Sequence, residues 1–159
     1  MDMPFPTSAD PSKGSTLGGS PVSLGTDLVY LPRIEALYHK YGNRFLDKIL
    51  THAEKVFCTT PVSLKVKVSR IAGRIAVKEA LVKALGIGVS TLGNFQGTMW
   101  TEVEVLREER QAPKIKLHGK ALQRAMDIGI ENWLISITHD GDYAMAMVMG
   151  LKQTSSSET

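Results

Sequence analysis

Cysteine is almost absent from this chain, because Cys58 is the only one among 159 residues. A single cysteine excludes an internal disulfide framework and a zinc site built from paired cysteines, and it is typical of a reducing compartment. Long apolar runs are also missing: the longest, from Tyr143 to Leu151, is far shorter than the roughly 20 residues that span a bilayer. No secretory signal pattern opens the chain. We therefore predict a soluble, cytoplasmic protein that does not enter a membrane.

Aromatic residues are scarce as well, at 6% of the chain, and they do not alternate with basic residues. This pattern argues against a platform on which nucleic-acid bases stack, so we expect no nucleic-acid partner. Glycine-rich phosphate loops and the HExxH and GxSxG motifs are missing too. Lys and Arg exceed Asp and Glu only by 19 to 16. That modest excess suggests an anionic partner, such as a phosphate ester or an acidic protein.

The length fits one folded domain with short extensions. Residues 1–20 contain Gly, Pro, Ser or Thr at 12 positions. Such a segment buries too little apolar surface to offset its chain entropy, so we expect a disordered extension. Residues 152–159, which include three consecutive serines, are expected to form a disordered tail. The domain itself is predicted to span residues 21–151.

The spacing of apolar residues predicts helices first and strands later. A strand over residues 22–29 is followed by short helices that begin near Pro32, at Asn43 as a cap, and at the capping-box sequence Thr51-His-Ala-Glu54. The longest helical pattern runs from 64 to 85 and ends at Gly86. Beyond it we predict a helix over 120–127 and strands over 101–106, 114–117, 133–138 and 143–149, the last two joined by a hairpin. This order indicates an α+β domain.

Glu79 is the most unusual residue of the long helix, because it lies on the apolar stripe. A carboxylate is costly to bury unless something pairs with it. Two explanations stay open from the residues alone: a helical ion pair with Lys83, worth about 0.2–0.5 kcal/mol, or a role as a Mg²⁺ ligand. The second explanation requires another carboxylate. Asp27 is the natural candidate, because Gly25 just before it leaves room for close approach.

Basic side chains fall in two groups, the row Arg70, Arg74 and Lys78 on the long helix and the cluster Arg33, Arg44 and Lys48 on the first two helices. A solvated surface explains either group. The functional alternatives are a phosphate-rich ligand for the row, since Arg donates paired hydrogen bonds to phosphate, and an acidic protein for the cluster. His139 ends a predicted strand beside the hairpin turn. A lone histidine is more often structural or exposed than functional, and the position beside a turn favours a functional role slightly.

Four segments of the chain, taken together, resemble the motifs of the holo-acyl-carrier-protein synthases, the short type of 4′-phosphopantetheinyl transferase. The segments are Gly25-Thr-Asp-Leu-Val29, Leu50-Thr-His-Ala-Glu54, Arg70-Ile-Ala-Gly-Arg-Ile-Ala-Val-Lys-Glu-Ala80 with Lys83-Ala-Leu-Gly-Ile-Gly88, and Ser136-Ile-Thr-His139 with Tyr143-Ala-Met-Ala146. The match runs from about Leu24 to Gly150. The resemblance implies a 4′-phosphopantetheinyl transferase-like fold, in which an antiparallel sheet packs against a long helix. It also implies a homotrimer with active sites at the subunit interfaces.

The resemblance further implies a reaction. The family transfers the 4′-phosphopantetheine arm of coenzyme A to a serine of apo acyl carrier protein, and adenosine 3′,5′-bisphosphate is released. By this resemblance Asp27 and Glu79 would hold Mg²⁺ and form the catalytic group together with Lys83. Either Glu79 or a water ligand of the metal would accept the serine proton, and the residues do not decide between them.

The remaining roles follow from the same resemblance. Coenzyme A would contact Arg74, Lys78, Lys83, Gly86, Gly88 and His139, and the acidic carrier protein would contact Arg33, Arg44 and Lys48. Since the family's sites lie at interfaces, Asp27 and Glu79 are expected to come from one chain and His139 from another. Ile75 stands where the family usually has an aromatic residue, so we expect a different pocket wall there.

Three functions therefore remain under consideration. The first is transfer to the carrier protein of fatty-acid biosynthesis. The second is the same chemistry on a carrier protein of polyketide or peptide synthesis. The third is a non-catalytic basic module that binds acidic proteins, in which Glu79 and Lys83 are only a helix pair.

Overall fold

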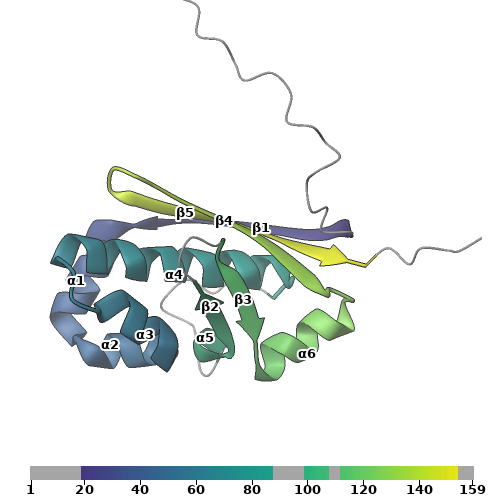
Figure 1. Cartoon of the computed structure of the whole chain (residues 1–159), viewed down its shortest axis with the longest axis horizontal. Helices are drawn as coiled ribbons and strands as arrows, with labels where there is room; N and C mark the ends of the chain where they lie inside the picture. Colours follow the sequence, from purple (N-terminus) through teal and green to yellow (C-terminus); the bar gives the residue numbers. More distant parts are fainter. Residues whose placement is uncertain (1–18, 88–98, 108–111, 154–159) are drawn as a thin grey trace, which may run out of the picture.

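The computed structural model describes residues 19–87, 99–107 and 112–153. In this part of the chain a three-stranded antiparallel sheet forms one layer, and the long helix α4 runs along one face of it (Figure 1). The strands are β1 (Ser20–Tyr30), β4 (Asn132–Asp140) and β5 (Tyr143–Lys152), in the order β1-β5-β4. The predicted α+β class, with an antiparallel sheet packed against a long helix, is confirmed.

The sheet has a buried face and an exposed face. In the β1–β5 register Asp27 lies opposite Ala146, and Val29 lies opposite Ala144. Ala144, Ala146 and Val148 of β5 are fully buried, whereas the residues that alternate with them are exposed. Small side chains on the buried face let α4 approach the strands closely, which matters for the site described below.

Three short helices follow β1: α1 (Leu31–Tyr41), α2 (Asn43–Ile49) and α3 (His52–Thr59). The capping box predicted at Thr51 and Glu54 is present. The prediction that Asn43 caps α2 is wrong, because Gly42 occupies the cap position and no side chain caps this helix. Gly42 has φ 54°, so it reverses the chain within one residue and places Asn43 already inside α2.

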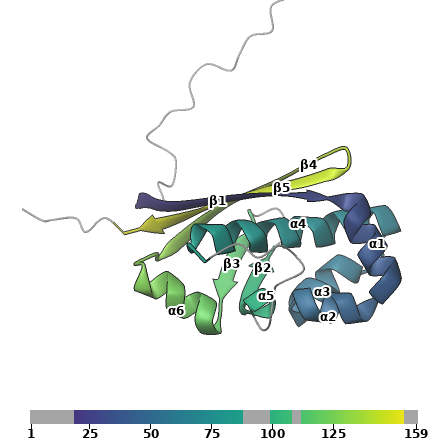
Figure 2. The same ribbon diagram turned by 180° about the vertical axis from the view of Figure 1, so that it is seen from behind.

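Helix α4 (Leu64–Ala84) starts at Ser63, whose hydroxyl accepts a hydrogen bond from the Val66 amide. Every residue from 71 to 82 is buried. The sheet covers one side of the helix, and the smaller elements lie on the opposite side of it, as the view from behind also shows (Figure 2). The charged residues of this stretch therefore lie inside the protein and must find partners there.

The remaining elements are α5 (Met99–Glu102), the strand pair β2 (Val103–Leu106) and β3 (Lys114–Leu117), and α6 (Gly119–Asp127). The strand predicted from residue 101 starts only at Val103. Contacts with a distant part of the chain explain the difference. The Glu102 carboxylate accepts a hydrogen bond from the Ala121 amide, and the Glu102 backbone carbonyl accepts one from the His118 amide, so Glu102 holds the start of α6.

Most of residues 1–20 and 152–159, the predicted disordered ends, lie outside the described residues. Ser20 and Lys152 are described, and they pair with each other in the sheet. Among the helices that the structure describes, none is sufficiently long and apolar to span a membrane.

Candidate functional site

Strand β1 and helix α4 approach each other closely at Gly25. A Cβ atom at this position would lie 1.8 Å from the carbonyl oxygen of Ala80, so a larger residue would force the strand and helix apart. Asp27 is two residues further along β1 and therefore faces α4 as well. The glycine brings the Asp27 carboxylate next to the second half of α4, which carries Glu79 and Lys83.

Lys83 is bonded to β1. Its ammonium donates to the Asp27 Oδ1 atom at 2.9 Å and to the Thr26 carbonyl at 2.8 Å. The close ion pair of Lys83 is therefore with Asp27 on the strand. Among the described residues Lys83 forms no ion pair within 4.0 Å of Glu79, the helix pair considered above, although its charge lowers the pKa of Glu79. Glu79 is only 6% exposed, and no group in the described part of the chain donates a hydrogen bond to its carboxylate.

The environment of Glu79 favours its protonated form. Burial, above all, and the negative charge of Asp27 raise the pKa of Glu79 from 4.5 to about 7, against the positive charges of Lys83 and Arg33, which lower it. A buried carboxylate beside a second carboxylate, with no hydrogen-bond donor of its own, is stabilised by a bound cation. Mg²⁺ is commonly held by one or two carboxylates together with substrate phosphates. The pair Asp27 and Glu79 fits such an ion.

These two carboxylates would not suffice for an ion held by protein atoms alone. The described residues contain no group of three or more His, Cys, Asp or Glu side chains that could hold a metal. The remaining ligands would have to come from a substrate or from water. The geometry thus favours an ion shared with an anionic substrate.

A cleft of about 540 Å³ lies along the first half of α4. Its described lining carries cationic side chains and a histidine, and no carboxylate; these residues are Lys65, Arg70, Arg74, Arg107 and His139. Such a lining attracts an anion with more than one negative charge. The structure thus brings Arg74 and His139, both expected to contact coenzyme A, into one cleft.

Arg74 has an unusual environment. It is 3% exposed, its guanidinium lies 4.3 Å from the centre of the Phe57 ring, and its Nε atom has no hydrogen-bond partner among the described residues. Burial lowers the pKa of Arg74. A buried guanidinium with an unused donor is costly by itself and would be stabilised by an anionic ligand.

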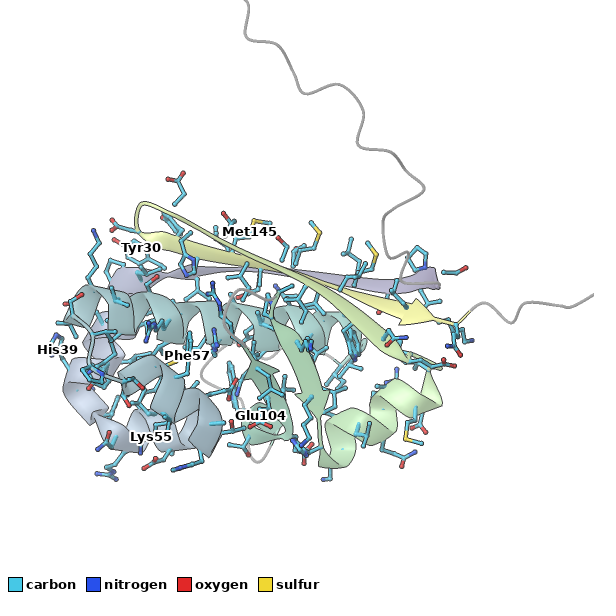
Figure 3. All side chains as sticks on the ribbon, viewed as in Figure 1. Tyr30, His39, Lys55, Phe57, Glu104 and Met145 are labelled. Carbon is cyan, nitrogen blue, oxygen red and sulfur yellow. The ribbon has the colours of Figure 1, made fainter. Side chains whose placement is uncertain are left out.

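Phe57 was not predicted as a site residue. It lies where α3 faces α4 (Figure 3), and its ring contacts both Arg74 and Arg70, the latter at 4.6 Å. Arg70 also donates a hydrogen bond to the Phe57 carbonyl at 2.7 Å. The signal in the sequence was its place on α3, one turn after Glu54, but only the fold shows that this turn faces the arginines.

His139 reaches the same cleft from the end of β4. Its Nε2 atom lies 3.1 Å from the Ser69 carbonyl, and a Cβ atom on Gly73 would lie 3.4 Å from Nε2. The imidazole therefore rests on α4 where the helix has no side chain. Gly73 gives His139 its position against the helix.

Lys78 is the main correction to the predicted basic row. It is 1% exposed, and its ammonium donates to the Glu54 carboxylate at 2.6 Å and to the carbonyls of Ile49 and Trp100, each at 2.7 Å. All three donor positions are taken by protein acceptors, so the position of Lys78 does not favour a contact with coenzyme A. The predicted row assumed a solvated side of α4, and α4 has none at this point.

Three other predictions have mixed outcomes. Ile75 is fully buried in the core, so its difference from the family pattern does not alter a described pocket wall. Gly86 follows α4 with φ 66°, and Gly88 lies outside the described residues.

Arg33, Arg44 and Lys48 are all exposed on α1 and α2. The charge of Arg33 lowers the pKa of Glu79, so this one member of the cluster acts on the site.

Known proteins of one family match this chain over most of its length. The family model for the 4′-phosphopantetheinyl transferase superfamily matches residues 23–148. A holo-[acyl-carrier-protein] synthase from Desulfovibrio desulfuricans is 43% identical over 128 residues, 80% of this chain and 95% of its own. One from Herpetosiphon aurantiacus is 37% identical over 128 residues, 80% of this chain and 96% of its own.

Solved structures of the same family have a fold similar to that of this chain. The holo-[acyl-carrier-protein] synthase of Helicobacter pylori, solved in complex with coenzyme A, superposes with a TM-score of 0.64 at 29% identity, and the match covers 80% of this chain and 98% of that one. The resemblance found in the sequence motifs is therefore confirmed: the chain belongs to the 4′-phosphopantetheinyl transferase superfamily.

Proposed function

We propose that this protein transfers the 4′-phosphopantetheine group of coenzyme A to a serine of apo acyl carrier protein, in a Mg²⁺-dependent reaction that serves fatty-acid biosynthesis. The observation that carries the proposal is the buried Glu79 carboxylate, which accepts no hydrogen bond from the residues that the structure describes and lies beside Asp27 and Lys83. Family membership and the relatives' names support the same reaction.

In the proposed mechanism Asp27 and Glu79 hold the metal ion. The ion would neutralise the diphosphate of coenzyme A and stabilise the charge that develops on the leaving phosphate. With the coenzyme bound, Lys83 would donate hydrogen bonds to its phosphates. The carrier serine oxygen forms a new bond to the phosphorus next to the pantetheine, the bond from that phosphorus to the bridging oxygen breaks, and adenosine 3′,5′-bisphosphate leaves.

The serine proton must leave as this bond forms. Glu79, with a pKa near 7, has the basicity of a general base at physiological pH, although a carboxylate bound to the metal becomes a weaker base. A water at the metal stays the alternative acceptor. The proton balance is the same with either group.

We propose that the cationic cleft receives the nucleotide end of coenzyme A. Arg74 offers an unused buried donor there, His139 rests beside it, and Lys65, Arg70 and Arg107 add positive charge. Adenosine 3′,5′-bisphosphate carries phosphates at both ends of its ribose, which suits such a lining.

We propose further that the protein is a homotrimer whose sites lie between subunits. Tyr30 and Met145 lie on the face of the sheet away from α4 (Figure 3). Leu24 and Leu28 of β1 and Met147 of β5 follow the same alternation along their strands, and these five side chains are 37–61% exposed. A contiguous apolar face of this kind favours association with other copies. In one chain Glu79 lies on the second half of α4, with Asp27 of β1 beside it, and the cleft lies along the first half of α4, so two chains would complete one site.

The carrier protein would dock on Arg33, Arg44 and Lys48. These cations are exposed, and Arg33 is close enough to Glu79 to lower its pKa, so an acidic partner there would place its serine near the metal. The cytoplasmic location stays a prediction.

Intact-mass analysis tests the proposed function. An apo acyl carrier protein is incubated with this protein, coenzyme A and Mg²⁺, with and without a chelator, and carriers of fatty-acid, polyketide and peptide synthesis are compared. We expect a gain of one phosphopantetheinyl group, fastest with the fatty-acid carrier and abolished by the chelator. No gain on any carrier, from folded protein, would favour the non-catalytic binding module.

A further inference from the structure

In the structure a cation already lies on one of the two carboxylates that fit a metal. The Lys83 ammonium is 2.9 Å from Asp27 Oδ1, and the Thr26 carbonyl holds it from the same strand at 2.8 Å. The side chains of Lys83 and Asp27 are 33% and 17% exposed, so water screens this pair less than it screens a pair on the open surface. Lys83 is thus anchored at two points on β1.

A lysine ammonium and a divalent cation compete for one carboxylate. Both need the negative charge of Asp27, and the two positive charges repel each other across a few ångströms. A metal ion that binds Asp27 and Glu79 must therefore weaken the Lys83–Asp27 bond. The freed ammonium then needs another anion, because a partly buried cation without a partner is costly.

We infer that Lys83 acts as a stand-in cation, which neutralises Asp27 in the free protein and yields it to the metal when substrate phosphates arrive. The identity of those phosphates, the diphosphate of coenzyme A, rests on the proposed function. Metal and coenzyme then bind with positive coupling, since each favours the arrangement in which Lys83 has left Asp27. By thermodynamic linkage each ligand raises the affinity for the other by the same factor.

If Lys83 has this stand-in role, removal of its charge should raise the affinity of the protein for the metal ion. The test is the affinity for Mn²⁺ alone, measured at pH 8 by the electron paramagnetic resonance signal of free Mn²⁺, with the full chain and no coenzyme. Lys83→Met keeps an unbranched side chain in the helix, and Lys83→Arg keeps the charge. Lys120→Met, which removes an exposed cation on α6, is the matched control. Circular dichroism verifies that each variant is folded.

We expect Lys83→Met to bind Mn²⁺ roughly five- to tenfold more tightly than the unaltered protein, which corresponds to about 1 kcal/mol. Lys83→Arg and Lys120→Met should stay within about twofold of it. Adding Asp27→Asn to Lys83→Met should remove the gain. Equal or weaker Mn²⁺ binding by folded Lys83→Met would overturn the stand-in role.

The same Mn²⁺ titration is then repeated in the presence of saturating coenzyme A. The Mn²⁺ that binds to the coenzyme in solution is subtracted. We expect coenzyme A to raise the affinity for Mn²⁺ in the unaltered protein by a larger factor than in Lys83→Met. An equal factor in both proteins would overturn the coupling. Tighter Mn²⁺ binding by Lys83→Met without any phosphopantetheinyl transfer by the unaltered protein would support the stand-in role and contradict the proposed function, so the two failures are distinguishable.

Discussion

The Lys78 ammonium lies 2.6 Å from the Glu54 carboxylate, and both side chains are at most 1% exposed. Glu54 also accepts hydrogen bonds from the amides of Thr51 and Val105. The pair therefore joins the start of α3, the middle of α4 and the strand β2 through charge-assisted bonds. It orders the interior next to Glu79 without taking part in the proposed chemistry.

The first prediction concerns the stability that depends on this pair. Lys78→Met leaves an uncompensated carboxylate in the interior and is expected to lower the free energy of unfolding by about 3–5 kcal/mol. Combining it with Glu54→Gln should cost less than the sum of the two single changes, because the partners are lost together. Urea denaturation measures both quantities. Full stability of the Lys78→Met single variant would contradict the observed network.

The second prediction uses the raised pKa of Glu79. Its folded value of about 7 exceeds the ordinary 4.5, so the folded state holds this proton more tightly than the unfolded state. The stabilisation from the proton is fully present below pH 4.5 and is lost as the pH rises through 7. Glu79→Gln should therefore match the unaltered protein near pH 4.5 and exceed its stability at pH 8 by about 1–3 kcal/mol.

Thermal melts without metal, recorded from pH 4.5 to 8, check this prediction. Adding Mg²⁺ and coenzyme A at pH 8 should raise the melting temperature of the unaltered protein more than that of Glu79→Gln. If the stability difference between Glu79→Gln and the unaltered protein stayed constant from pH 4.5 to 8, the pKa of Glu79 would not be raised by folding, and the prediction would be contradicted.

Some of these relationships could be predicted from the sequence. The burial of Glu79 was predicted because a charge on an apolar stripe of a helix is visible in the periodicity, and Gly25 indicated a close approach next to Asp27. The capping box at Thr51 and Glu54 is local, so four consecutive residues of sequence suffice to predict it. The hairpin at Asp140-Gly141 is local in the same way.

The role of Lys78 could not be predicted in this manner. Its partner Glu54 is 24 residues away in the chain, and the row that it shares with Arg70 and Arg74 looks like a solvated ridge in the sequence. Only the packing of elements on both sides of α4 shows that this row is interior. Phe57 was missed for the same reason, since its contact with Arg74 depends on how α3 lies against α4.

The third prediction concerns the cationic cleft. Arg74→Met is expected to weaken binding of adenosine 3′,5′-bisphosphate by roughly 10- to 100-fold, because hydrogen bonds to charged groups are worth about 1.5–3 kcal/mol. Isothermal titration calorimetry measures this loss, and Lys120→Met serves as a control outside the cleft. An unchanged dissociation constant for Arg74→Met would show that the nucleotide binds elsewhere.

The fourth prediction addresses the apolar face of the sheet. Leu28→Glu places a charge on this face, where Leu28 is 61% exposed in the single chain, and should convert the proposed trimer to a monomer without transferase activity. Met126→Glu is the matched control, since Met126 is 62% exposed but lies on α6. Size-exclusion chromatography with light scattering distinguishes the two. A monomeric unaltered protein would contradict the proposed assembly.

The measurement that tests the central claim most directly is complementation between two inactive chains. Glu79→Gln removes a proposed metal ligand, and His139→Ala alters the proposed nucleotide cleft, so each variant alone should transfer little phosphopantetheine to apo acyl carrier protein. If one site is built from Glu79 of one copy and His139 of another, co-expression of both variants should restore a substantial part of the activity, measured by intact mass. Inactive mixed assemblies, of confirmed composition, would contradict a site shared between chains.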